Sequence, residues 1–217
     1  MNGLLFITHQ TEKYSYLQSM EMALSGGCRQ VQLRMKEASP AEIEKVGKKA
    51  KALCDKHKAK LYIDDYVEIC RNVGAAGVHL GKLDMPPSEA RKILGDSFVI
   101  GGTANTFDDI LRLKQEGVDY IGLGPFRFTT TKKNLSPILG LEGYRRILYE
   151  CKINEINLPV FAIGGITVAD IPHILNAGAS GIALSSTILN AENPIGETMK
   201  IINIINSLKH EEIDNCR

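Results

Sequence analysis

The chain has 217 residues, of which 44% are hydrophobic and 24% charged, a balance that can bury the core of one domain. Lysine and arginine number 26 against 25 acidic residues, and a formal net charge of +1 argues against nucleic-acid binding, which needs a basic surplus on one face. No apolar run is long enough to span a membrane, and the first residues predict a strand rather than a signal peptide. Five scattered cysteines without a CxxC pair are typical of reduced thiols in a cytoplasmic protein.

Short apolar runs alternate with amphipathic stretches along the whole chain. The runs that have the length of buried strands are 4–8, 30–34, 60–64, 77–81, 98–103, 120–124, 159–164 and 181–185. The clearest helical stretches are 41–56, 87–94, 107–115 and 194–208, and glycines suited to helix ends stand at 26–27, 74, 117 and 178. This alternation, without a hairpin signal, predicts a parallel sheet. We therefore expect an α/β fold, a (βα)8 TIM barrel that forms a single domain over residues 1–217.

A doubly wound open sheet is the alternative architecture. It would favour a GxGxxG turn after the first strand, and the residues from Thr8 to Thr11 contain no glycine. The barrel is therefore the better interpretation, and in barrels the active site lies at the C-terminal ends of the strands.

The second and third predicted strands end in charged residues. Arg34 and Lys36 follow Gln32, and a guanidinium fork beside an ammonium group suits a diphosphate, although the same residues could simply be solvated at the rim. The adjacent carboxylates of Asp64 and Asp65 predict a Mg²⁺ ligand. One of them is also expected to cap a helix over 65–71.

The fourth predicted strand is followed by Asp84, which should reach the same space as Asp65 because strands three and four are neighbours. Two carboxylates from adjacent loops make a better Mg²⁺ site than one. His79 lies inside this strand, where a structural role is favoured over a functional one.

The loops after strands six to eight favour a second anion site. Residues 124–134 are rich in hydroxyl groups and cations, as an oxyanion needs, although a solvated surface loop is the alternative. Gly164 and Gly165 follow strand seven, and Ser185 and Ser186 end strand eight. Loops at these two positions often bind phosphate, because glycine lets backbone N–H groups approach the anion. Thr167 and Asp170, next to the glycines, predict a helix capping box.

Together these motifs resemble the thiamine phosphate synthase family, which is closely related to the thiazole tautomerases. The resemblance covers nearly the whole chain and rests on the segments VQLRMK (31–36), IDD (63–65), GVHLG (77–81), GLGPF (122–126), TTTKK (129–133) and AIGGI (162–166). It implies a Mg²⁺-dependent transferase of thiamine biosynthesis. In that reaction, 4-amino-2-methyl-5-hydroxymethylpyrimidine diphosphate is joined to thiazole phosphate and diphosphate is released.

The resemblance also implies roles for individual residues, with Arg34 and Lys132 as the catalytic cations. The residues implied to bind the pyrimidine diphosphate are Gln32, Arg34, Lys36, Asp64, Thr103 and Lys132. Those implied to bind the thiazole phosphate are Thr129, Thr131, Gly165, Ser185 and Ser186. The implied Mg²⁺ ligands are Asp65 and Asp84.

The chain departs from the family pattern at several positions. Asp64 and Tyr66 stand where the family has Asn and Arg, Arg127 stands in a segment that usually contains Pro, and Lys82 replaces a Gln. An aspartate in place of the asparagine puts an acceptor near the diphosphate, which is unhelpful unless it is protonated or bound to metal.

The tautomerase relative carries a histidine at the position of Asn105 and often lacks the metal pair. Asn105 and the retained carboxylates therefore favour the synthase. A tautomerase-like isomerase and a non-catalytic paralogue that binds thiamine intermediates are the alternatives. The expected partners are phosphorylated small molecules, with no nucleic acid and no membrane. The sequence leaves the oligomeric state open, a homo-oligomer included.

Overall fold

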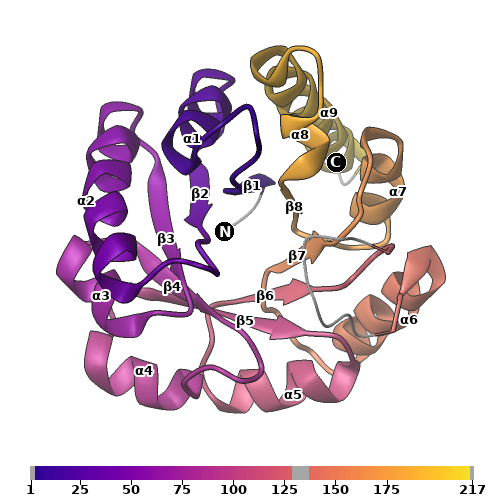
Figure 1. The fold of residues 1–217 in the computed structure, drawn as a ribbon. Coiled ribbons are helices and arrows are strands. Elements are labelled where there is room, and N and C mark those ends of the chain that lie inside the picture. Colours follow the sequence, from indigo (N-terminus) through magenta and orange to yellow (C-terminus); the bar gives the residue numbers. More distant parts are fainter. Residues whose placement is uncertain (1–2, 129–136, 216–217) are drawn as a thin grey trace.

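A computed structural model, which describes residues 3–128 and 137–215, contains a closed barrel of eight parallel strands (Figure 1). The strands are β1 (Gly3–Ile7), β2 (Gln30–Leu33), β3 (Lys60–Asp64), β4 (Gly77–Leu80), β5 (Val99–Ala104), β6 (Tyr120–Leu123), β7 (Val160–Ile163) and β8 (Gly181–Leu184). They follow one another around the barrel in chain order, and β8 pairs with β1 to close it. The predicted (βα)8 TIM barrel is confirmed.

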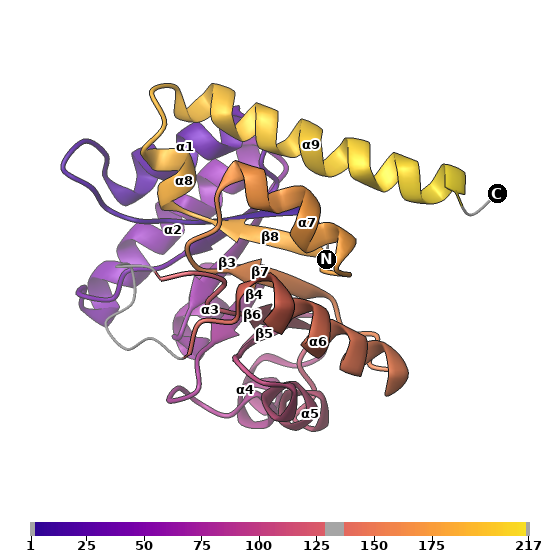
Figure 2. The same ribbon diagram turned by 90° about the vertical axis from the view of Figure 1, so that its right-hand side faces the viewer.

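The helices surround the barrel (Figure 1). They are α1 (Tyr16–Ser25), α2 (Pro40–Lys56), α3 (Val67–Val73), α4 (Pro87–Leu94), α5 (Phe107–Gln115), α6 (Gly140–Ile153), the 3-10 helix η1 (Val168–Asp170), α7 (Ile171–Asn176), α8 (Ser186–Leu189) and α9 (Pro194–Asn215). Helix α9 continues beyond its predicted end at residue 208. Figure 2 shows it lying across α1, α7 and α8, with its C-terminal end projecting past the barrel. In the part of the chain that the structure describes, no helix is both long and apolar enough to cross a membrane.

Helix α3 begins differently from the prediction. Its N-cap residue is Tyr66, which makes no side-chain capping bond, so the expected cap by one of the two aspartates is wrong. Asp65 adopts a left-handed backbone conformation (φ 67°), and its carboxylate contacts Lys36 across the barrel rim instead of the helix N-terminus. The carboxylate is therefore directed to the site rather than to the helix.

The predicted glycine helix ends are largely correct. Gly74 closes α3 in the left-handed conformation (φ 68°), which costs glycine little because it has no Cβ. At the end of α1, Gly27 (φ 95°) takes the positive φ, whereas Gly26 keeps a φ of −75°.

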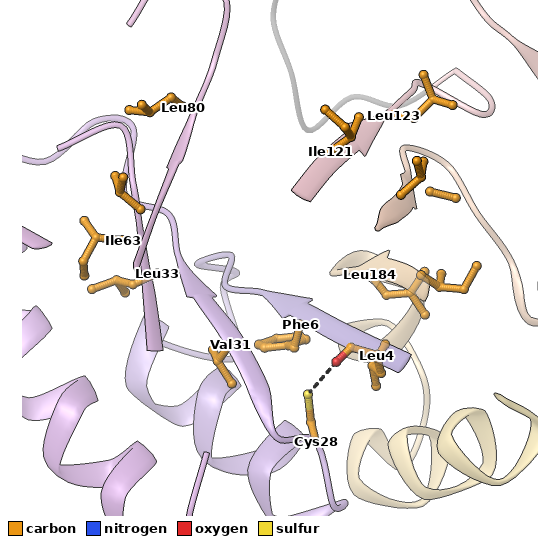
Figure 3. Close-up of a cluster of buried hydrophobic side chains, with 14 of the residues drawn as sticks. Leu4, Phe6, Cys28, Val31, Leu33, Ile63, Leu80, Ile121, Leu123 and Leu184 are labelled. Atoms are coloured by element: carbon orange, nitrogen blue, oxygen red, sulfur yellow. Dashed lines mark hydrogen bonds between the residues drawn. The ribbon is translucent and has the colours of Figure 1, made fainter. Parts of the chain in front are cut away.

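The larger part of the core lies between the strands and the helices. Figure 3 shows outward-facing strand residues of this layer, among them Phe6, Leu33 and Leu123, which are almost fully buried. The thiol of Cys28 donates a hydrogen bond to the carbonyl of Leu4 at 3.7 Å. Burial raises the pKa of this thiol to about 11, so Cys28 is an inert core residue.

A second, smaller cluster fills the inside of the barrel. Tyr120 stands between Tyr62 and Phe161, with ring centroids 6.0 and 5.8 Å away in edge-on arrangements. Each of these rings lies opposite a glycine on a neighbouring strand. Tyr62 pairs with Gly77, Tyr120 with Gly101, and Phe161 with Gly181. A Cβ atom on Gly101 would lie only 2.2 Å from the Tyr120 ring. Gly101 and Gly181 thus make room for the rings of Tyr120 and Phe161 inside the barrel.

Candidate active site

A cavity of about 250 Å³ opens at the C-terminal ends of the strands. The predicted site residues that line it are Gln32, Arg34, Lys36, Asp64, Asp65, Thr103, Gly165, Ser185 and Ser186. Asp84 lines a smaller neighbouring cavity. Thr129, Thr131 and Lys132 lie outside the described residues. The fold therefore gathers every predicted site residue that it describes at one end of the barrel.

The wall formed by β2 and β3 is a charged cluster centred on Asp64, which is only 7% exposed. The Gln32 amide donates a hydrogen bond to this carboxylate. Arg34 Nε lies 3.5 Å from it and Lys36 Nζ 3.3 Å from it. Lys36 also forms an ion pair with Asp65. The cations and carboxylates that the sequence singled out are in direct contact.

This contact sets the charge of the wall. Burial alone would lower the pKa of Lys36, but the negative charges of Asp64 and Asp65 outweigh burial and raise it, so the ammonium stays protonated. Arg34 is charged at any ordinary pH. The negative charges of Asp64 and Asp65 therefore balance the positive charges of Arg34 and Lys36. The wall has no surplus of positive charge.

Asp65 faces Asp84, which follows β4. One oxygen of Asp84 accepts a hydrogen bond from the Gly81 N–H at 2.6 Å. Burial and the neighbouring Asp65 carboxyl raise the pKa of Asp84 above its usual range. Within residues 3–128 and 137–208, no three His, Cys, Asp or Glu side chains converge on a common point. A cation held here would take two protein carboxylates and complete its shell with water or ligand oxygens, which is the usual arrangement for Mg²⁺.

The floor of the cavity contains a buried polar chain. His79 lies 3.0 Å from the Tyr120 hydroxyl through Nδ1 and 2.9 Å from the Thr103 hydroxyl through Nε2. Both ring nitrogens are engaged within the barrel, in agreement with the structural role predicted for this histidine. The contact holds the Thr103 side chain at the cavity surface.

The opposite wall comes from the loops after β7 and β8. Gly164 and Gly165 both have positive φ, at 94° and 67°. The Thr187 hydroxyl donates a hydrogen bond to the Ile166 carbonyl at 2.6 Å, which ties the two loops together. The Ser185 hydroxyl is buried and has no hydrogen-bond partner among the described residues. A buried hydroxyl without a partner is unfavourable, so this side chain is suited to a polar ligand.

Arg127 is a site residue that sequence reasoning missed. Its guanidinium forms a bidentate ion pair with Asp170, at 2.8 and 3.0 Å, and donates a further bond to the Gly165 carbonyl at 2.7 Å. Its backbone N–H donates to the Gly164 carbonyl at 2.9 Å. The guanidinium also lies 5.1 Å from the centre of the Phe126 ring. Arg127 thereby fastens the loop after β6 to the glycine loop after β7.

Asp170 is held from two sides. Besides Arg127, it accepts bonds from the backbone N–H and the hydroxyl of Thr167, which form the predicted capping box. The Arg127 guanidinium, with help from Thr167, keeps the pKa of Asp170 well below its usual range. The sequence marked Arg127 as a departure and Thr167 with Asp170 as a cap, but gave no sign that they meet.

Lys82, a departure from the family pattern, and Asn105, at the position of the tautomerase histidine, both line the cavity. Lys82 forms an ion pair with Asp109 at 2.7 Å. The Asn105 side-chain amide donates a hydrogen bond to the Gly124 carbonyl. Asn105 is thus a neutral side chain whose donor is already bonded within the protein.

A closed parallel barrel with a polar cavity at the C-terminal ends of its strands has the architecture of a (βα)8 barrel enzyme. A family model described as thiamine monophosphate synthase matches residues 4–188. Thiamine-phosphate synthase of Bacteroides thetaiotaomicron is 57% identical over 209 residues, which are 96% of this chain and 100% of that protein. The corresponding protein of Flavobacterium psychrophilum is 41% identical over 193 residues, 89% and 94% of the two chains.

Solved structures agree with these relatives. Thiamine phosphate pyrophosphorylase from Pyrococcus furiosus superposes with a TM-score of 0.84 at 31% identity, covering 95% of this chain and 96% of that one. The chain therefore belongs to the thiamine monophosphate synthase family. The resemblance predicted from the sequence is confirmed, and with it the prediction of a transferase.

Proposed function

We propose that this enzyme joins 4-amino-2-methyl-5-hydroxymethylpyrimidine diphosphate to thiazole phosphate, which yields thiamine phosphate and diphosphate. The observation that carries the proposal is the pairing, in one cavity, of a charged wall from β2 and β3 with a glycine and serine wall from the loops after β7 and β8. Each wall suits one of the two phosphorylated substrates, and relatives at 57% identity carry this activity in their name.

This reaction requires that the enzyme position the two substrates and neutralise the charge of the leaving diphosphate. It requires no protein nucleophile. The bond between the pyrimidine methylene carbon and the diphosphate oxygen breaks, and diphosphate leaves with the electron pair. The thiazole nitrogen then supplies the electron pair of the new carbon–nitrogen bond. An enzyme favours such a step by holding the two reactants in line and by stabilising the charge on the leaving group.

The β2–β3 wall is assigned to the pyrimidine diphosphate. Arg34 and Lys36 bind the diphosphate oxygens, while Gln32 and Thr103 lie deeper, next to the pyrimidine ring. Lys132, which lies outside the described residues, is assigned to the leaving group by the family pattern alone. We assign Asp64 to the same site, which is supported by its contacts with Arg34 and Lys36.

Asp65 and Asp84 are assigned to Mg²⁺. The fit rests on two partly buried carboxyl groups that face each other and on the raised pKa of Asp84, because a divalent cation would relieve their mutual repulsion. When bound, Mg²⁺ supplies positive charge to the diphosphate oxygens. The charge balance of the wall supports this assignment. Because Asp64 and Asp65 already neutralise Arg34 and Lys36, the wall has no surplus positive charge to offer the diphosphate.

The opposite wall is assigned to the thiazole phosphate. Gly165 lets the backbone approach the anion, and Ser185 and Ser186 offer hydroxyl groups, the first of which lacks another partner among the described residues. Thr129 and Thr131 are assigned to this set by the family pattern alone.

The cytoplasmic location and the homo-oligomer stay predictions from the sequence.

The experiment is an assay of the purified protein with both substrates and Mg²⁺, in which thiamine phosphate is measured while each component is omitted in turn. We expect product only in the complete mixture. A tautomerase-like isomerase would instead act on a thiazole substrate alone and without Mg²⁺. Asn105 argues against that activity, because its neutral amide cannot carry a proton as a histidine does.

A further inference from the structure

We propose that Asp64 is an internal competitor for diphosphate, which weakens the hold of the metal-free enzyme on this group and so favours release of the diphosphate product. The inference rests on the proposed function in one respect only, namely that diphosphate binds at the β2–β3 wall. It assigns a purpose to an aspartate that stands where the family pattern has asparagine.

Asp64 and a bound diphosphate need the same positively charged side chains. The Asp64 carboxylate contacts Arg34 and Lys36, which are assigned to the diphosphate, and Gln32, which is assigned to the pyrimidine ring. A diphosphate that enters the cavity must therefore share these donors with Asp64 or draw them away from it. Since Asp64 belongs to a barrel strand and is 7% exposed, it cannot swing aside into solvent as a surface aspartate can.

Charge strengthens the competition. A carboxylate this deeply buried is poorly screened by water and salt, so it repels a nearby polyanion more strongly than an exposed carboxylate does. Bound Mg²⁺ would offset the repulsion, whereas loss of Mg²⁺ would restore it. Diphosphate would then be held firmly with the metal and poorly without it.

The substitution that isolates this effect is Asp64→Asn. Asparagine has the same shape and keeps an oxygen that can accept the Gln32 hydrogen bond, while an NH2 group replaces the oxygen that faces Arg34 and Lys36, so the variant removes the hold of Asp64 on these two cations. Asp55→Asn is the matched control. It makes the same change in net charge on α2, where Asp55 forms an ion pair with Lys51 on the helix surface.

The measurement is calorimetric titration of inorganic diphosphate into each protein in the presence of a chelator. We expect Asp64→Asn to bind diphosphate about tenfold or more tightly than the wild type, because one unfavourable charge contact is removed. Asp55→Asn should bind as the wild type does. Equal or weaker binding by Asp64→Asn would overturn the proposal.

Titration with Mg²⁺ alone separates this role from that of a third metal ligand. A competitor that acts only through its charge lowers the Mg²⁺ affinity of Asp64→Asn less than the loss of a ligand does in Asp65→Asn, whereas an equal loss in the two variants overturns the proposal. If Asp64→Asn does not fold, as judged by thermal melting, Asp64→Ser is put through the same titrations and the same outcomes decide. These titrations contain no organic substrate, so their result is independent of whether the protein makes thiamine phosphate.

Discussion

Replacing Arg127 with alanine should damage the thiazole phosphate half of the site and spare the pyrimidine half. Arg127 holds the Gly165 carbonyl at 2.7 Å and Asp170 at 2.8 and 3.0 Å, and so it sets the position of the glycine loop. It does not line the cavity itself. The loss should therefore appear as poorer positioning of one substrate, without loss of a group that touches it.

The size of the effect follows from the contacts that disappear. A hydrogen bond from a charged donor to a carbonyl contributes about 1.5 kcal/mol. Arg127 is half exposed, so its ion pair with Asp170 adds only about 0.5 kcal/mol. If binding of thiazole phosphate weakens by this sum of about 2 kcal/mol, its KM rises about 30-fold.

The assay is steady-state kinetics with each substrate varied in turn. We expect a large rise in KM for thiazole phosphate, a small change in KM for the pyrimidine diphosphate, and partial recovery in Arg127→Lys. Arg145→Ala, which removes an exposed arginine paired with Glu142 on α6, is the matched control and should behave as the wild type. Equal losses for both substrates, or no loss at all, would refute the positioning role.

Four further substitutions test the metal site, the leaving-group cation and the packing of the barrel interior. Asp65→Ala or Asp84→Ala should abolish Mg²⁺-dependent turnover while circular dichroism and Tm stay near wild type; normal turnover in either variant would mean that the metal site is misplaced. Lys132→Ala should lower kcat more than it lowers thiazole phosphate affinity, and a pure affinity effect in the same kinetics would move this residue to the other wall. Gly101→Ala should lower the free energy of unfolding by about 2 kcal/mol in denaturant titration, because its methyl group overlaps the Tyr120 ring, and an unchanged stability would show that the barrel interior is less tightly packed.

The sequence predicted the fold well because hydrophobic periodicity and helix ends are local signals. Predicted helices 87–94 and 107–115 have the bounds of α4 and α5, and the predicted strand 60–64 is β3. The mistaken cap at Asp65 has a physical cause. A carboxylate before a helix can serve either the helix N-terminus or a nearby cation, and Lys36, far away in the sequence, decides between them.

The site was predictable where its residues follow strand ends and hidden where side chains meet across loops. Strand order around a barrel brings Asp65 and Asp84 together, so their meeting could be foreseen. The contact of Arg127 with Asp170 joins two loops of different βα units, and no periodic pattern encodes it. The departure at Arg127 marked the position as unusual but gave no sign of its partner.

The most direct test of the proposed reaction is its stoichiometry, followed by ³¹P nuclear magnetic resonance with both substrates and Mg²⁺. We expect thiamine phosphate and inorganic diphosphate to appear together in equal amounts, and neither to form when one substrate is left out. The proposed reaction would be contradicted if both substrates bind and no thiamine phosphate forms, or if diphosphate is released without the new carbon–nitrogen bond.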